Sequence, residues 1–122
     1  MILLSMIFLH ILDDWVLQDK LGLMKQKDWW LKHPEYKPMY KYDYVVALLT
    51  HGFSWTFMIM LPIALMLSWN VSGLFFIVFV GNWLIHSFVD DLKANKRKIN
   101  LVADQFIHII QIIVTYIVFT CF

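Results

Sequence analysis

Histidine and aspartate recur one helical turn apart at three places in the chain. Each pair is separated by four positions, and the pairs are His10 with Asp14, His86 with Asp90, and Asp104 with His108. Residues four apart lie on one face of an α-helix, so both members of a pair can point at the same partner. Neutral imidazole and carboxylate are ligands of zinc, manganese and iron. The spacing therefore indicates a metal site built between helices.

Further polar residues extend this set within apolar sequence. His51 stands in a fourth apolar stretch, with Ser54 about one turn away. The candidate metal ligands are His10, Asp14, His51, His86, Asp90, Asp104 and His108. Amides close to them in the helical repeat are expected to fix the orientation of the ligands, and these are Gln18, Asn82, Gln105 and Gln111. With a single cysteine, Cys121, a sulfur-rich site is excluded.

The segments that must position these side chains are strongly apolar. Hydrophobic residues make up 61% of the 122 residues and charged residues only 16%, against about 25% charged in soluble domains. A helix needs about 20 residues to cross the hydrocarbon. Four segments approach that length, namely residues 1–18, 44–69, 71–89 and 106–122. We predict an all-α polytopic membrane protein, a single domain of four transmembrane helices in a bundle.

The charges predict how this bundle is oriented. All ten Lys/Arg, nine Asp/Glu and five His residues can be placed on one side of the membrane. The basic loop 91–103 and the aromatic and basic segment 19–43 hold most of them, and an excess of lysine and arginine marks the cytoplasmic face. Both termini are then on the outer side of a cytoplasmic membrane. Aspartate lies nearer the cytoplasm in all three pairs, with histidine one turn deeper, so the site should face the cytoplasm.

The segment 19–43 carries lysines interleaved with aromatic rings, including Trp29, Trp30 and Tyr36. This pattern favours a segment lying on the anionic leaflet, with the lipid bilayer rather than nucleic acid as the partner. We expect His33 to be an ordinary surface histidine. Asp13 and Asp91 are turned about 100° from their neighbours on a regular helix, so we expect them at the interface rather than among the ligands.

Metal-dependent hydrolysis is the reaction that suits this set of residues. One or two divalent ions are expected, zinc first and manganese or iron as alternatives, because paired ions about 3.5–4 Å apart clamp both oxygens of a displacement. Asp14, Asp90 and Asp104 are the candidate catalytic carboxylates, and one of them would act as general base. Lys93 would hold a phosphate oxygen. The predicted substrate is a lipid or a lipid-linked phosphoester.

At these residues the chain resembles a small polytopic membrane family of unknown function found in bacteria and tailed phages. That family carries His-x-x-x-Asp-aromatic-x-Leu-Gln near its start, here His10, Asp14, Trp15, Leu17 and Gln18. An isolated histidine in the second span is His51, His-x-x-x-Asp-x-x-Lys is His86, Asp90 and Lys93, and Asp-Gln-x-x-His is Asp104, Gln105 and His108. A looser likeness links the pattern to membrane-bound metal-dependent hydrolases, which implies the same class of reaction.

Two other functions fit the same residues. In the first, the protein is a non-enzymatic membrane interaction or phage host-interference factor, and the polar rows join helices by hydrogen bonds of about 0.6–2 kcal/mol each. The second is transport of protons or metal ions along aligned His/Asp rows. The outer halves of the spans are nearly uncharged, so a conduit would require a homo-oligomer.

Overall fold

The computed structural model describes residues 1–35 and 37–122, so Tyr36 of the aromatic segment lies outside the described residues. Described elements are all helical, with no strand among them. In chain order they are α1 (Ile2–Ile11), the π-helix η1 (Leu12–Leu17), α2 (Asp19–Met24), α3 (Lys27–Lys32), the 3₁₀-helix η2 (Pro38–Tyr40), α4 (Asp43–Met66), α5 (Gly73–Ala94) and α6 (Leu101–Cys121). The predicted all-helical class is confirmed.

Three of the helices are long and apolar enough to cross a membrane. They are α4, which forms the candidate span Pro38–Met66 together with η2, then α5 and α6. The mean hydropathy of their best windows lies between 1.5 and 1.8. Large apolar side chains such as Phe76, Ile77 and Val114 are exposed on their outer surfaces. Since exposed apolar area on this scale is unfavourable in water, these surfaces suit contact with lipid.

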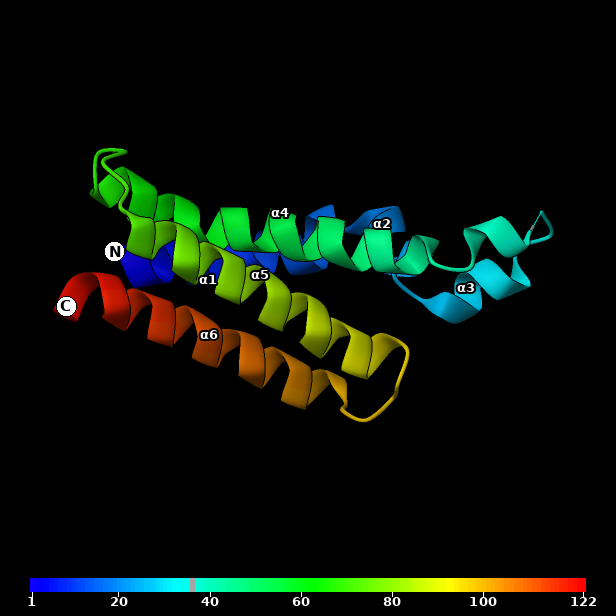
Figure 1. Cartoon of the computed structure of the whole chain (residues 1–122). Helices are drawn as coiled ribbons and strands as arrows, with labels where there is room; N and C mark the ends of the chain where they lie inside the picture. Colours follow the sequence, from blue (N-terminus) through cyan, green and yellow to red (C-terminus); the bar gives the residue numbers. More distant parts are fainter. Residues whose placement is uncertain (36) are drawn as a thin grey trace.

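The helices form a closed bundle in which each long element packs mainly against two neighbours. α4 packs against α1 and α5, and α6 packs against α5 and α1. Figure 1 shows the N- and C-termini at the end of the bundle that holds the α4–α5 connection. The α5–α6 connection and the short helices α2 and α3 lie at the other end. Most of the charged residues predicted to share one side of a membrane therefore do lie at one end of the molecule.

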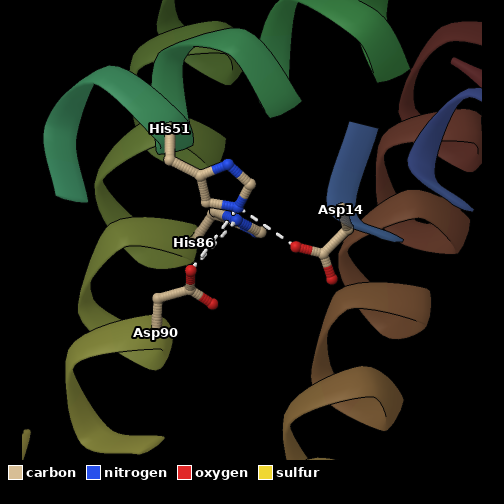
Figure 2. A group of neighbouring side chains, drawn as sticks. All are labelled: Asp14, His51, His86 and Asp90. Atoms are coloured by element: carbon tan, nitrogen blue, oxygen red, sulfur yellow. Dashed lines mark hydrogen bonds and ion pairs between the residues drawn. The ribbon is translucent and has the colours of Figure 1, made fainter. Parts of the chain in front are cut away.

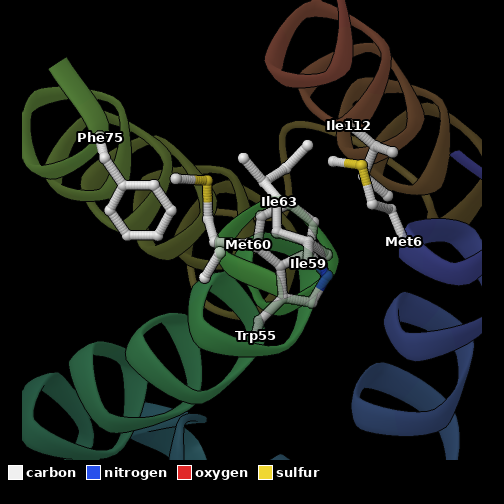
Figure 3. Close-up of a cluster of buried hydrophobic side chains, with 8 residues drawn as sticks. Met6, Trp55, Ile59, Met60, Ile63, Phe75 and Ile112 are labelled. Carbon is white, nitrogen blue, oxygen red and sulfur yellow. The ribbon is translucent and has the colours of Figure 1, made fainter. Parts of the chain in front are cut away.

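The apolar core fills the half of the bundle towards the termini. Trp55, Ile59 and Ile63 of α4 are fully buried there, together with Met6 of α1 and Ile112 of α6. Figure 3 shows side chains from α1, α4, α5 and α6 converging on this cluster. Trp55 marks the boundary of the core, because its ring also contacts histidines of the polar half. The core thus seals one side of the polar cluster.

The π-helix η1 turns Asp13, which the sequence predicts at the membrane interface, into the interior of the bundle. Its i→i+5 hydrogen bonds turn each residue by less than the 100° of an α-helix. Asp13 and Asp14 consequently both point inward, and each is only 3% exposed. Oδ1 of Asp13 accepts a hydrogen bond of 2.6 Å from Ser54 Oγ on α4. The expectation that Asp13 lies at the interface is wrong, because it assumed a regular α-helix.

Outside the bundle, α5 and α6 are each longer than their predicted membrane spans. α5 runs to Ala94, and α6 starts at Leu101, where Asn100 Oδ1 accepts a hydrogen bond from the Ala103 amide. Asp91 lies on this extension and is bonded to Asn95 and Lys96, away from the bundle interior. It is half-buried, in keeping with the interfacial position expected from the sequence.

Two glycines within the spans give a matched test of this packing. A Cβ at Gly52 would stand 2.1 Å from Ser87 Oγ and 3.1 Å from the Trp83 carbonyl oxygen, whereas a Cβ at Gly81 meets nothing within 4 Å. Gly52→Ala should lower the free energy of unfolding by about 1–3 kcal/mol through overpacking. Gly81→Ala should be neutral or raise it by up to about 1 kcal/mol. Thermal unfolding in detergent, followed by circular dichroism, compares them. Equal melting of the two variants would contradict the α4–α5 packing.

Candidate metal centre

Polar side chains from five elements meet in the half of the bundle beyond Trp55. Four histidines and four aspartates are at most 3% exposed there. They are His10, Asp13, Asp14, His51, His86, Asp90, Asp104 and His108. Asp13 and Asp14 come from η1, and the others come from α1, α4, α5 and α6. The structure therefore brings all seven sequence-predicted ligand candidates into one buried region.

The first group of potential ligand atoms comprises Asp14, His51, His86 and Asp90, whose atoms lie within 4.8 Å of one another. His51 Nε2 is 3.1 Å from Asp14 Oδ1 and 3.5 Å from Asp90 Oδ2. His86 Nε2 is 3.8 Å from the same Asp90 oxygen and has no hydrogen-bond partner within residues 1–35 and 37–122. Figure 2 shows the two imidazoles and the two carboxylates facing a common point.

The second group comprises Asp14, Asp104 and His108. His108 Nε2 is 3.4 Å from Asp104 Oδ1 and also 3.4 Å from Asp90 Oδ1. Asp14 belongs to both groups, and Asp90 presents one oxygen to each group. Carboxylates shared in this way are how helical bundles hold two ions side by side. The arrangement therefore has places for one or two ions.

The distances within the groups fit metal coordination better than hydrogen bonding. Most nitrogen–oxygen separations are 3.4–3.8 Å, longer than the 2.7–3.2 Å typical of such hydrogen bonds. Ligands about 2.0–2.1 Å from a tetrahedral ion are about 3.3 Å from each other. Asp104 Oδ1 and His86 Nε2 are buried and lack any hydrogen-bond partner among the described residues. A divalent ion would supply the partner of Asp104 Oδ1.

A chain of hydrogen bonds fixes the ring orientation of His108. Asn82 Nδ2 donates to Thr115 Oγ1 at 2.7 Å, and Gln111 Nε2 donates to Asn82 Oδ1 at 3.2 Å. Gln111 Oε1 then faces His108 Nδ1 at 3.3 Å and can only accept. The proton of neutral His108 is thus placed on Nδ1, and the lone pair of Nε2 points at Asp104 and Asp90. With the ring neutral, three electron-pair donors face one another here, and a cation between them would be well coordinated.

The rings of His86 and His108 limit how both groups can be filled. Their Nδ1 atoms are 3.2 Å apart, and this contact can hold only one proton. When His108 donates it, His86 Nδ1 accepts and its own proton is on Nε2. A first ion at His108 needs no rearrangement of these rings. A second ion at His86 requires the two rings to separate.

His10 is the one predicted ligand that belongs to neither group. Its Nδ1 accepts a hydrogen bond of 2.7 Å from Trp55 Nε1, so the remaining ring nitrogen carries the proton when the ring is neutral. No lone pair is then free for an ion. The ring contacts that of His108, with centroids 6.0 Å apart. His10 therefore supports the site from its deeper side in this structure.

Two lysines complete the cluster. Lys25 Nζ lies 2.5 Å from Asp90 Oδ2, and Lys93 Nζ lies 2.5 Å from Asp104 Oδ2. The sequence predicts Lys93 near the site, because it lies one turn beyond Asp90. It does not predict Lys25 there, because the neighbours of Lys25 in the sequence are those of an ordinary basic surface segment. Its burial, at 4% exposure, results from the way α2 and α3 fold back over α4.

The predicted amides divide between two roles. Gln105 Nε2 donates to Asp14 Oδ2 at 2.7 Å and to Asp104 Oδ2 at 3.0 Å, so it orients both carboxylates. Asn82 and Gln111 act on His108 as described. Gln18 donates to the Asp14 backbone oxygen, and no hydrogen bond joins it to a ligand side chain among the described residues. Trp55 and Thr115 had no marker in the sequence, since each is a common residue in a membrane helix.

Comparison of the chain with models of known protein families, with curated proteins and with solved structures gives no match.

The hydrogen-bond chain to His108 predicts an effect without removing any ligand. Gln111→Leu should weaken zinc binding by about tenfold to a hundredfold, as loss of groups that orient metal ligands typically does. Isothermal titration of the metal-free protein in detergent measures the affinity. Gln26→Leu is the matched control, because the Gln26 side chain donates to the Gly22 carbonyl oxygen and has no hydrogen bond to a metal-ligand side chain among the described residues. If both variants bound zinc like the parent protein, the hydrogen bonds that lead from Thr115 to His108 would have no role in metal binding.

Proposed function

We propose that the protein is a multi-pass protein of a cytoplasmic membrane, with four spans, both termini outside and the His/Asp site facing the cytoplasm. The basic residues at the α5–α6 end of the bundle support this orientation. The fourth span would be α1 continued by η1, which run without a break from Ile2 to Leu17. Its aspartates point into the bundle, where they avoid the cost of facing lipid.

The single cysteine offers a direct test of this orientation. Cys121 is exposed near the end of α6. A membrane-impermeant maleimide should label it in intact cells. In a Cys121→Ser variant that also carries Lys98→Cys, in the α5–α6 connection, labelling should occur only after the membrane is permeabilised. The reverse pattern would place the site on the outer side.

We infer that the cluster binds a divalent cation. Charge is the observation that carries this inference: four buried aspartates face two lysine ammonium groups. Burying an uncompensated charge in an apolar bundle costs several kcal/mol. One divalent ion balances the remaining charge while the imidazoles stay neutral, and neutral imidazole is also the form that binds metal. Zinc is the first choice for this set of nitrogen and oxygen ligands, with manganese or iron as alternatives.

Removing one charge without removing a hydrogen-bonding group tests the metal site. Asp14→Asn keeps the size of the side chain, and Asp14 is the residue shared by both groups. We expect the purified parent protein to hold one or two equivalents of metal by plasma mass spectrometry, and the variant to lose most of it. His33→Ala is the control, since His33 is exposed and lies outside both groups. Full metal content in folded Asp14→Asn would contradict the site.

For the reaction, we propose hydrolysis of a phosphoester of a lipid or lipid-linked substrate. A bound ion would lower the pKa of a coordinated water, to about 7 for a zinc-type ion, and would polarise a phosphoryl oxygen. The water oxygen bonds to phosphorus as the bond from phosphorus to the leaving alcohol breaks. Asp90 or Asp104, whichever belongs to the group that is not filled, takes the proton from water and passes it to the alcohol. Lys93, at the more exposed edge of the site, would hold a phosphate oxygen.

This reaction predicts metal-dependent release of inorganic phosphate from phosphatidate in mixed micelles. Chelation should abolish the release and added zinc should restore it. Asp90→Asn and Asp104→Asn should each reduce it by at least about a hundredfold, in the range for loss of a general base. If the parent protein held metal but released no phosphate from phosphatidate, the hydrolytic proposal for this lipid class would fall and the metal site would stand.

A purely structural role for the polar cluster is the competing account. Hydrogen-bonded helix contacts would tolerate aspartate-to-asparagine changes, because asparagine still donates and accepts. Asp104 Oδ1 and His86 Nε2 have no hydrogen-bond partner among the described residues, which speaks against it, since buried polar atoms that join helices should be bonded.

A further inference from the structure

Lys25 is the one buried lysine of the chain segment that precedes α4. It follows α2, and its side chain enters the bundle to reach Asp90 Oδ2 at 2.5 Å. The side chain is 5% exposed and the carboxylate fully buried. Burying a lysine in such a position costs several kcal/mol unless its charge is compensated. The same Asp90 oxygen is a potential metal-ligand atom of the first group.

The backbone around Lys25 is fixed to the end of α5. Asn95 Nδ2 donates to the Lys25 carbonyl oxygen at 3.0 Å, and Asn95 Oδ1 accepts from the Lys27 amide at 2.6 Å. Arg97 adds an ion pair of 2.8 Å to Asp28, one turn further. Asn95 thus clamps the chain on both sides of Gln26. These contacts hold the backbone at Lys25 in place, which directs its side chain into the bundle.

An ion in the first group and the Lys25 ammonium group compete for Asp90. Both carry positive charge, and both would lie within about 2–3 Å of the same oxygen. Their mutual repulsion weakens metal binding as long as the ammonium group stays. With an ion bound, the ammonium group would leave Asp90 Oδ2 but stay near the site, because the backbone is clamped.

We propose that Lys25 is an anion-binding residue of the site, which neutralises Asp90 before metal binding and holds a phosphate oxygen of the ligand afterwards. This rests on the proposed metal site. Lys93 stands in the same relation to Asp104, so two ammonium groups flank the two groups of metal ligands. Both are point charges with several donors, suited to the rotating oxygens of a phosphate. The ligand is therefore a phosphate ester, either a monoester dianion or a diester monoanion. It would be free in solution or part of a lipid headgroup.

Two affinities that change in opposite directions distinguish this role from a structural ion pair. Lys25→Met keeps the length of the side chain and removes its charge. Zinc affinity of the metal-free protein should rise by about tenfold, because a competing cation is removed. Affinity of the zinc-loaded protein for inorganic phosphate should fall by roughly tenfold to a hundredfold, the usual effect of losing a charge-assisted hydrogen bond. Isothermal titration measures both quantities.

Lys27→Met is the matched control. Lys27 lies two residues from Lys25, is exposed and has no ion pair among the described residues. Both variants lose one lysine, so the net charge of the protein changes by the same amount in each. This variant should leave both affinities at the parent values. If Lys25→Met bound zinc and phosphate like the parent protein, the proposal would be overturned while the metal site remained. Absence of zinc binding in the parent protein would instead overturn the metal site and the proposal with it.

A second variant keeps the test open if Lys25→Met does not fold. Asn95→Ala retains every charge of the site and removes both hydrogen bonds of the clamp. Zinc affinity should rise and phosphate affinity should fall, each by less than in Lys25→Met, since the ammonium group is then less well placed. Unchanged affinities in this variant would also overturn the proposal. Inorganic phosphate and vesicles containing phosphatidate, used in parallel, distinguish a free phosphate from a lipid headgroup.

Discussion

Four carboxylates buried in a bundle with an apolar exterior impose the constraint on which the rest of the structure depends. Each is at most 3% exposed, and burying an ion costs several kcal/mol unless it is paired. Positive charge must therefore be brought to them. Lys25 and Lys93 supply part of it, and the place where His108 Nε2 faces Asp104 and Asp90 indicates where a divalent ion would supply the remainder.

This constraint also explains the irregular parts of the fold. A regular α-helix would have turned Asp13 out of the bundle, whereas η1 keeps both neighbouring aspartates inside. π-helical turns often occur at functional sites. The segment before α4 folds back over the bundle end and is clamped by Asn95, which delivers Lys25. The apolar core around Trp55 closes the opposite side, so that the site can open only towards the charged end.

The sequence was sufficient for what depends on regular periodicity. The rows of His and Asp four residues apart predict a shared face on α5 and α6, and the structure brings their side chains together. Periodicity fails where the helix changes from α to π. The α-helical repeat therefore predicts Asp13 at the interface, whereas η1 turns it into the bundle. Periodicity also cannot show which ring nitrogen is engaged, so the Trp55 hydrogen bond that occupies His10 was not foreseen. Lys25 depends on a chain reversal outside the helices, which no local pattern encodes. The number of spans and their orientation stay predictions from charge and length.

X-ray absorption at the zinc edge of the metal-loaded protein tests the central claim most directly. It reports the ligands of the ion itself, whatever the reaction. The account predicts a first shell of nitrogen and oxygen only, at about 2.0–2.1 Å, with outer-shell scattering from at least one imidazole that disappears in His108→Ala or His51→Ala. Zinc that binds without any imidazole signal, or that is removed by a single desalting step, would contradict it.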